Sequence, residues 1–200
     1  MRCGFYLLLA ALGAVIVGIP SAAQEAGEHP HGGNLHSPYA GKDAREIRTL
    51  SKEDIEELQA GAGWGLATAA ELNGVPGPAH LLEMADREEM RFSAGQLEQI
   101  RSLHREMADR AIPLGFRLIE QERELNRRFA DGTITEEELQ ELLAQIGETT
   151  AKLRFVHLSA HLKTLPILSP HQVHTYNQLR GYSLEEDAAP AAHAPMTHRP

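Results

Sequence analysis

The sequence contains few cysteines, few aromatic residues and fewer basic than acidic side chains. Cys3 is the only cysteine among 200 residues, which excludes a disulfide framework within the chain and a cysteine-rich zinc site. Aromatic residues make up 5% of the chain and runs of β-branched residues are scarce, so a β-sandwich or β-barrel is not expected. Lys and Arg number 19 against 28 Asp and Glu, for a formal net charge of -9. Nonspecific nucleic-acid binding requires neutralisation of phosphates, so we expect no nucleic-acid partner.

The sequence also lacks the common catalytic motifs. It has neither a Gly-x-Ser-x-Gly elbow nor a Gly-x4-Gly-Lys phosphate loop. His157 and His161 enclose Leu-Ser-Ala, so the glutamate that activates water in a His-Glu-x-x-His metalloprotease is missing. The glycine cluster at residues 61–65 follows no strand pattern, and close packing around Trp64 explains it better than dinucleotide binding. We therefore expect that the protein is not an enzyme.

Residues 1–23 are predicted to be a cleaved secretory signal peptide. Arg2 supplies the positive start, the run 5–19 is apolar and uncharged, and Pro20 precedes the small residues at 21–23. The run is shorter than the roughly 20 apolar residues of a membrane-spanning helix. A lipoprotein needs a cysteine after the apolar run, whereas Cys3 lies before it. These features predict export, and we expect a periplasmic protein, although the apolar run does not by itself distinguish the periplasm from the medium.

Two tails of biased composition frame the predicted folded domain. Residues 24–40 are rich in Gly, Pro and His, residues 184–200 are rich in Ala and Pro, and both are predicted to be disordered. Between them, residues 41–183 show frequent helix starts and stops and no sustained period-two alternation. The domain is therefore predicted to be all-α.

The strongest pattern predicts two long helices. Ser93 with Gln96 resembles a capping box, and an apolar stripe continues to about Phe129 with Pro113 as a kink. After a turn at residues 131–132, a second helix follows to about residue 162. A short turn between amphipathic helices favours an antiparallel pair. The sequence thus predicts a long, bent antiparallel helical hairpin over 93–163, short flanking helices and a last helix at 170–180.

Two five-residue segments share one pattern. Phe92-Ser93-Ala94-Gly95-Gln96 and Leu168-Ser169-Pro170-His171-Gln172 each have an apolar residue, a hydroxyl and a glutamine three residues after it. A hydroxyl followed by such a glutamine satisfies the unpaired N–H groups at the start of a helix. Ser93, Gln96, Ser169 and Gln172 are therefore interpreted as helix caps with no catalytic role.

The pair of segments resembles the twin Leu-Thr-x-x-Gln motifs of the Spy/CpxP family of periplasmic stress proteins, which has zinc-associated and heavy-metal-sensor relatives. The resemblance covers about residues 92–182, and the first segment departs from it with Phe92 for Leu and Ser93 for Thr. It implies a cradle-shaped antiparallel homodimer that shields unfolded or misfolded exported proteins without ATP. A regulatory partner of a membrane sensor protein is an alternative that would use the same helical surface.

A chaperone of this kind needs an apolar surface for its clients. The groove predicted to bind exposed apolar client segments is lined by Met107, Leu114, Leu118, Leu153 and Val156.

Histidine is frequent, with 11 residues, and suggests a second function. His157 and His161 lie four apart on one predicted helix, and His171 and His174 lie three apart on the last. If the last helix folds back, these four could bind a divalent metal such as zinc or copper, as in a sensor or resistance protein; no cofactor is required for the fold. His80 and His104 are isolated candidates. The alternatives are half-buried packing, or a polar cluster in which His157 and Arg154 bond Glu120 or Glu124 across the hairpin.

Overall fold

The structure is a computed structural model that describes residues 37–182. The chain divides into two compact units after Pro38, and the described residues belong almost entirely to the second unit, which begins at Tyr39. The predicted signal peptide at 1–23, the tail at 184–200 and most of segment 24–40 lie outside the described residues. No helix within 37–182 combines the length and apolar character that a bilayer crossing requires.

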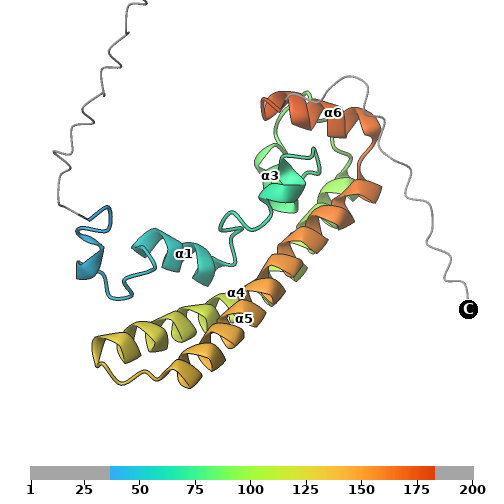
Figure 1. Cartoon of the computed structure of the whole chain (residues 1–200). Helices are drawn as coiled ribbons and strands as arrows, with labels where there is room; N and C mark the ends of the chain where they lie inside the picture. The colour runs from blue at the N-terminus through green and yellow to red at the C-terminus, as the bar shows by residue number, and fades with distance from the viewer. Residues whose placement is uncertain (1–36, 183–200) are drawn as a thin grey trace, which may run out of the picture. The chain divides into compact units, whose positions relative to one another are not determined.

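The described part of the chain contains helices and no strands, which confirms the all-α class (Figure 1). Two short 3-10 helices, η1 and η2, accompany six α-helices. In chain order the elements are η1 (Lys42–Ala44), α1 (Lys52–Ala60), α2 (Thr68–Glu71), α3 (Pro78–Glu83), α4 (Ala94–Ala130), α5 (Glu136–Thr164), η2 (Leu165–Ile167) and α6 (Pro170–Leu179).

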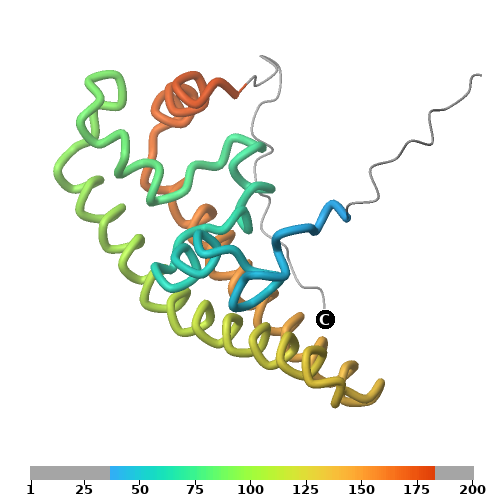
Figure 2. The backbone as a smooth tube through the Cα atoms, turned by 90° about the vertical axis from the view of Figure 1, so that its left-hand side faces the viewer, coloured from blue at the N-terminus to red at the C-terminus, as the bar shows by residue number. Residues whose placement is uncertain are grey.

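The helices α4 and α5 run side by side along their lengths, and α4 bends on the way (Figures 1 and 2). α4 has 37 residues and continues through Pro113, and the chain reverses at Gly132, whose positive φ of 63° suits glycine. Capping boxes start both helices, at Ser93 and at Thr135. The long pair forms the scaffold on which the shorter helices α1, α2 and α3 lie.

The core has two parts. One lies where α1 packs against α4 and α5, and the other lies where α3, the start of α4 and α6 meet. Gly115 of α4 permits the close approach of α1, because a Cβ atom at this position would collide with the carbonyl oxygen of Leu58. The buried residues of the first part are Ile47, Leu50, Leu58, Leu103, Met107, Ala111, Leu118, Ile119, Leu153, Val156 and Ala160. Those of the second are Leu81, Met90, Ile100, Leu168 and Tyr176.

The residues predicted to line a client groove are not on an open surface, which corrects that expectation. Met107, Leu118, Leu153 and Val156 are buried in the first part of the core, and Leu114 is half-buried against it. The physical reason is that the apolar stripes of α4 and α5 face each other, and that α1 and the chain before it pack over these residues. These side chains therefore hold the monomer together.

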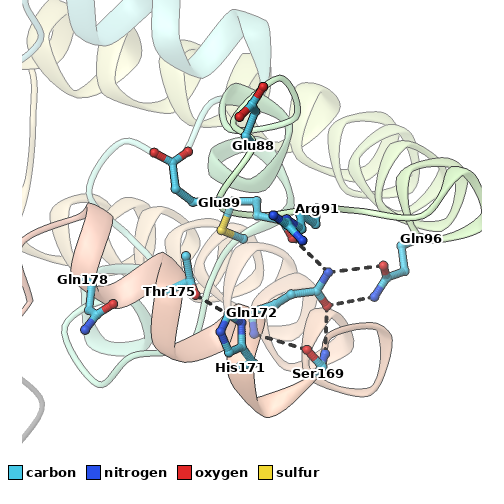
Figure 3. A pocket seen from close by; sticks show the side chains of 10 residues that line it. Glu88, Glu89, Arg91, Gln96, Ser169, His171, Gln172, Thr175 and Gln178 are labelled. Carbon is cyan, nitrogen blue, oxygen red and sulfur yellow. Dashed lines mark hydrogen bonds between the residues drawn. The ribbon is translucent and has the colours of Figure 1, made fainter.

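The two glutamine caps form one hydrogen-bonded unit, which we call the amide clasp: Ser93, Gln96, Ser169 and Gln172. Figure 3 shows three of these residues, Gln96, Ser169 and Gln172. Each glutamine Oε1 accepts from the backbone N–H of its own cap serine, at 3.0 Å for Gln96 and 2.9 Å for Gln172. The Nε2 of Gln96 donates to Oε1 of Gln172 at 2.9 Å, and the Nε2 of Gln172 lies 3.3 Å from Oε1 of Gln96. The starts of α4 and α6 are thus locked to each other.

Each glutamine also reaches the chain that leads into the other helix. Gln96 Nε2 donates to the carbonyl oxygen of Ile167 at 2.8 Å, and Gln172 Nε2 donates to that of Met90 at 3.1 Å. The arrangement is nearly symmetric, and Gln172 is buried. Buried polar groups cost free energy unless they are paired. Removal of either glutamine would leave the amide of the other without one of its hydrogen-bond partners.

The amide clasp can be separated from simple helix capping by Gln172→Glu. A glutamate retains the oxygen that caps Ser169 but loses the donor to Met90 and faces the oxygen of Gln96. We expect a loss of about 2 kcal/mol in the free energy of unfolding, measured by urea denaturation at pH 7. The matched control is Glu138→Gln, the reverse exchange in the exposed capping box of α5, which should cost less than about 1 kcal/mol. Equal effects of the two exchanges would show that Gln172 acts only as a cap.

Candidate functional site

A hollow of about 490 Å³ lies beside α5. The chain from the end of α1 to α3 lines one side of it, and His104 and Met107 of α4 line another. Its volume falls within the roughly 300–1,000 Å³ of typical small-ligand sites. Most of its lining is small or apolar, but polar side chains converge on it from five separate segments. We call it the histidine hollow, and its polar side chains with ionisable groups are Glu71, His80, Glu83, His104, His157, His161, Arg180 and Tyr182.

His157 lies in α5 and is the most buried of these histidines, with 2% of its surface exposed. Its Nε2 atom has no hydrogen-bond partner. Burial lowers the pKa of His157, and the neighbouring His161 lowers it further, because both disfavour the charged imidazolium. The ring is therefore neutral at pH 7, with an unpaired nitrogen inside the protein.

His161 follows one turn later and is held by the chain between α2 and α3. Its Nδ1 lies 2.7 Å from the carbonyl oxygen of Val75. Since a carbonyl oxygen only accepts, Nδ1 carries the proton and Nε2 retains its lone pair. Thr164 Oγ1 donates to the carbonyl oxygen of Pro76 at 2.6 Å and so pins the same segment to α5. A backbone carbonyl on one ring nitrogen is the usual support of a histidine that binds metal through the other.

Gly77 lies directly against His161. A Cβ atom at this position would stand 2.5 Å from Nε2 of His161. The backbone at Gly77 therefore packs against this ring more closely than any residue with a side chain would allow. Burial also lowers the pKa of His161, against the opposing effects of the Val75 carbonyl and of Glu71.

Glu71, at the end of α2, is buried with 8% of its surface exposed. Its Oε1 accepts from the hydroxyl groups of Tyr176 and, at 3.1 Å, Tyr182, and lies 3.3 Å from Nε of Arg180. Its Oε2 has no hydrogen-bond partner and lies 3.9 Å from Nδ1 of His161. Burial and the hydrogen bond to Glu71 raise the pKa of Tyr176, so this hydroxyl remains a donor.

His80 of α3 and His104 of α4 line the hollow and are half-buried. The Nδ1 atom of His80 lies 3.1 Å from Oε2 of Glu83 on the same helix. Within residues 37–182, no three His, Cys, Asp or Glu side chains stand close enough together to hold a metal ion as they are placed. The hollow thus gathers metal-binding residue types without assembling them into a coordination shell.

The four histidines predicted to bind metal together are divided between two places. His157 and His161 line the histidine hollow, whereas His171 lines a different, open hollow beside the amide clasp and lies 3.4 Å from the hydroxyl of Thr175 (Figure 3). His174 is exposed. They are not brought together because α6 meets α4 through its N-terminal cap and carries His171 on the outer side of that contact.

The alternative polar cluster across the two long helices does not form. Glu120 pairs with Arg123, and Glu124 pairs with Arg127 and Arg128, all on α4 itself. His157 instead faces the hollow that α1, α2 and α3 help to close. Sequence reasoning missed Glu71, Tyr176 of α6 and Tyr182 after α6. A lone carboxylate at the end of a four-residue helix carries no periodic signal.

Comparisons with protein-family models, with curated proteins and with solved structures each find no match to the chain. The geometry of the hollow therefore carries the functional argument.

The buried histidines predict a loss of stability in mild acid. The folded-state pKa values of His157 and His161 lie below the ordinary value of 6.5, so the unfolded chain takes up protons first as the pH falls. The free energy of unfolding should be at its full value above pH 6.5 and decrease as the pH falls through the folded-state pKa values. Urea midpoints between about pH 8 and pH 5 measure this decrease. His157→Gln should reduce it, and the matched exchange of the exposed His174→Gln should leave it unchanged.

Proposed function

We propose that this is an exported, Spy/CpxP-like protein of the bacterial envelope, built on a long helical hairpin, that binds a divalent transition metal in the histidine hollow. One observation carries the proposal. A neutral, buried imidazole, His157, has an unpaired nitrogen at a hollow that also receives His161 and Glu71. An unpaired buried polar atom costs free energy, and a bound cation offsets that cost.

The chemistry of the donors fits a borderline metal ion. Neutral imidazole suits zinc, copper and nickel, and one carboxylate adds the negative charge that favours a dication. His157 and His161 would supply Nε2 atoms. Glu71, whose Oε2 lies 3.9 Å from Nδ1 of His161, would turn toward them to supply a carboxylate oxygen. His80 and His104 stand at the hollow on other helices and would complete the shell by rotating about their side-chain bonds. The metal is then cargo or signal, as in a sensor or resistance protein, and the proposal includes no catalytic step.

Metal binding is tested by calorimetric titration of the mature chain with Zn²⁺. His157→Ala/His161→Ala should weaken binding by more than about 100-fold, since the loss of a mere supporting group around a metal already costs 10–100-fold. His171→Ala/His174→Ala is the matched control, because it removes two histidines at the same kind of spacing outside the hollow. An unchanged affinity in the first double variant would remove the histidine hollow as the site.

A second candidate function, the holding of unfolded exported proteins, rests on exposed apolar side chains. Phe155 is 63% and Leu162 is 58% exposed, two turns apart on one face of α5. A shallow hollow lined by Pro113, Leu114 and Val156 lies beside Phe155. Charged residues of both signs flank it: Asp109, Arg110, Glu148 and Lys152. This face, rather than the buried stripe between α4 and α5, would cover apolar segments of a client, or of a membrane sensor in the regulatory alternative.

The holding function is tested by suppression of aggregation of a denatured client at equal molar ratio. Phe155→Ser/Leu162→Ser should weaken client binding by more than about 100-fold, since burial of each such side chain contributes about 1.5–3 kcal/mol. Leu72→Ser is the matched control, because Leu72 is also 63% exposed but lies at the C-terminal cap of α2. Equal protection by wild type and the double variant would exclude this face, and no protection by wild type would exclude the function.

A further inference from the structure

The loop between α1 and α2, residues 61–67, forms one wall of the histidine hollow, and in Figure 1 it lies between the labels α1 and α3. It lines the hollow with glycine and alanine: Gly61, Ala62, Gly63, Gly65 and Ala67. Residues this small leave the hollow unfilled on this side. The contacts that hold the loop in place therefore decide how open this side of the hollow is.

The loop is packed tightly at its first residue and loosely further on. A Cβ atom at Gly61 would stand 3.0 Å from Cγ1 of Ile112 in α4, whereas one at Gly63 would meet nothing within 4 Å. Among residues 37–182, the backbone hydrogen bonds of the loop stay between residues 57 and 71, so none of them ties it to α4 or α5. The middle of the loop can thus move without breaking a backbone hydrogen bond to the long helices.

One side chain tethers the loop through a polar contact. Trp64 donates from Nε1 to Oδ1 of Asp54 at 2.8 Å. Its ring is half-buried against the first part of the core, as is Leu66. The backbone of Trp64 has a φ of 43°, in the left-handed region that a residue of this size rarely adopts. Such a conformation costs free energy and persists only where other contacts hold it, so release of the indole would let the backbone relax.

We propose that residues 61–67 are a lid on the histidine hollow and that the hydrogen bond between Trp64 and Asp54 is its latch. In the closed state the latch and the packing of the indole offset the strain at Trp64. In the open state the strain is relieved and these contacts are lost. Because the two effects oppose each other, the open state remains accessible as a minor population. The role of the lid as the entry route for the metal rests on the proposed function, whereas the opening of the loop does not.

Asp54 serves the latch with one oxygen and the start of α1 with the other, and a substitution can separate the two. Its Oδ2 accepts from the backbone N–H of Ser51 at 2.7 Å. Asp54→Asn retains an oxygen for Ser51 and turns an amino group toward the indole N–H, so the helix start remains and the latch is lost. Gly63→Ala acts in the opposite direction, because the methyl group has room in the closed loop and restricts the backbone of the open one.

Opening is measured by hydrogen exchange of residues 62–67 and by acrylamide quenching of Trp64, the only tryptophan of the chain. Asp54→Asn should speed hydrogen exchange of these amides by about tenfold and make Trp64 easier to quench, because the latch is one hydrogen bond to a charged group. Gly63→Ala should slow hydrogen exchange by about two- to fivefold. Hydrogen exchange within α1 should stay as in wild type. The matched control is Glu138→Gln, the corresponding substitution in the capping box of α5, which should leave the loop unchanged.

Entry is measured by the rate at which Zn²⁺ associates with the mature chain. Asp54→Asn should raise this rate and Gly63→Ala should lower it, each by the factor seen in hydrogen exchange, since the open loop admits the ion.

The outcomes separate the lid from the proposed function. Equal hydrogen exchange in wild type and Asp54→Asn, or a rise that spreads over α1, would show that Asp54 is a helix cap and no latch. If the loop opens more often but the Zn²⁺ association rate is unchanged, the lid is not the entry route and the proposed function stands. If Zn²⁺ does not bind wild type, the proposed function and the entry route are both wrong, and hydrogen exchange alone decides whether the latch exists.

Discussion

The fold depends on the pairing of two side-chain amides, Gln96 and Gln172. Serine or threonine caps start four of the helices, but the third residue of the box differs: Asp54 in α1, Glu138 in α5, and glutamine in α4 and α6. An ionised carboxylate can only accept hydrogen bonds, so the capping box of Asp54 or Glu138 offers no side-chain donor to a neighbouring helix. A glutamine accepts from its own cap and retains two donors, so it can also hold another helix. The choice of glutamine thus turns a local signal into a tertiary contact that sets where α6 starts, and with it where Tyr176 and Tyr182 meet Glu71.

Other hydrogen bonds account for the polar groups that are buried around the histidine hollow. The segment between α2 and α3 is fixed to α5 by two hydrogen bonds to its carbonyl groups, from His161 and from Thr164. These bonds satisfy the backbone and at the same time select which nitrogen of His161 remains free. A helix as short as α2 has little stability of its own, so its position depends on such contacts and on Tyr176 and Tyr182, which bond Glu71. Structure and candidate site therefore share the same hydrogen bonds.

Much of the secondary structure could be predicted from the sequence, and little of the site. Ser93, Thr135 and Ser169 predict helix starts because capping is a local interaction between residues three apart. The pairing of Gln96 with Gln172 could not be predicted, since it joins residues 76 apart. The apolar stripe through Leu118 and Leu153 predicts that these side chains are buried, but not whether a client or the protein itself buries them. In the structure they pack in the core together with Leu58 of α1. His157 and His161 were found by their helical spacing, whereas Glu71 depends on contacts that only the folded chain supplies.

Gly77 has a consequence for the position of His161. A Cβ atom at residue 77 would stand 2.5 Å from Nε2 of His161, so any other residue would push the imidazole ring or the chain between α2 and α3 out of place. Such a shift would also disturb the hydrogen bond between Nδ1 of His161 and the carbonyl oxygen of Val75. The placement of one histidine in α5 thus depends on a residue 84 positions earlier that has no side chain.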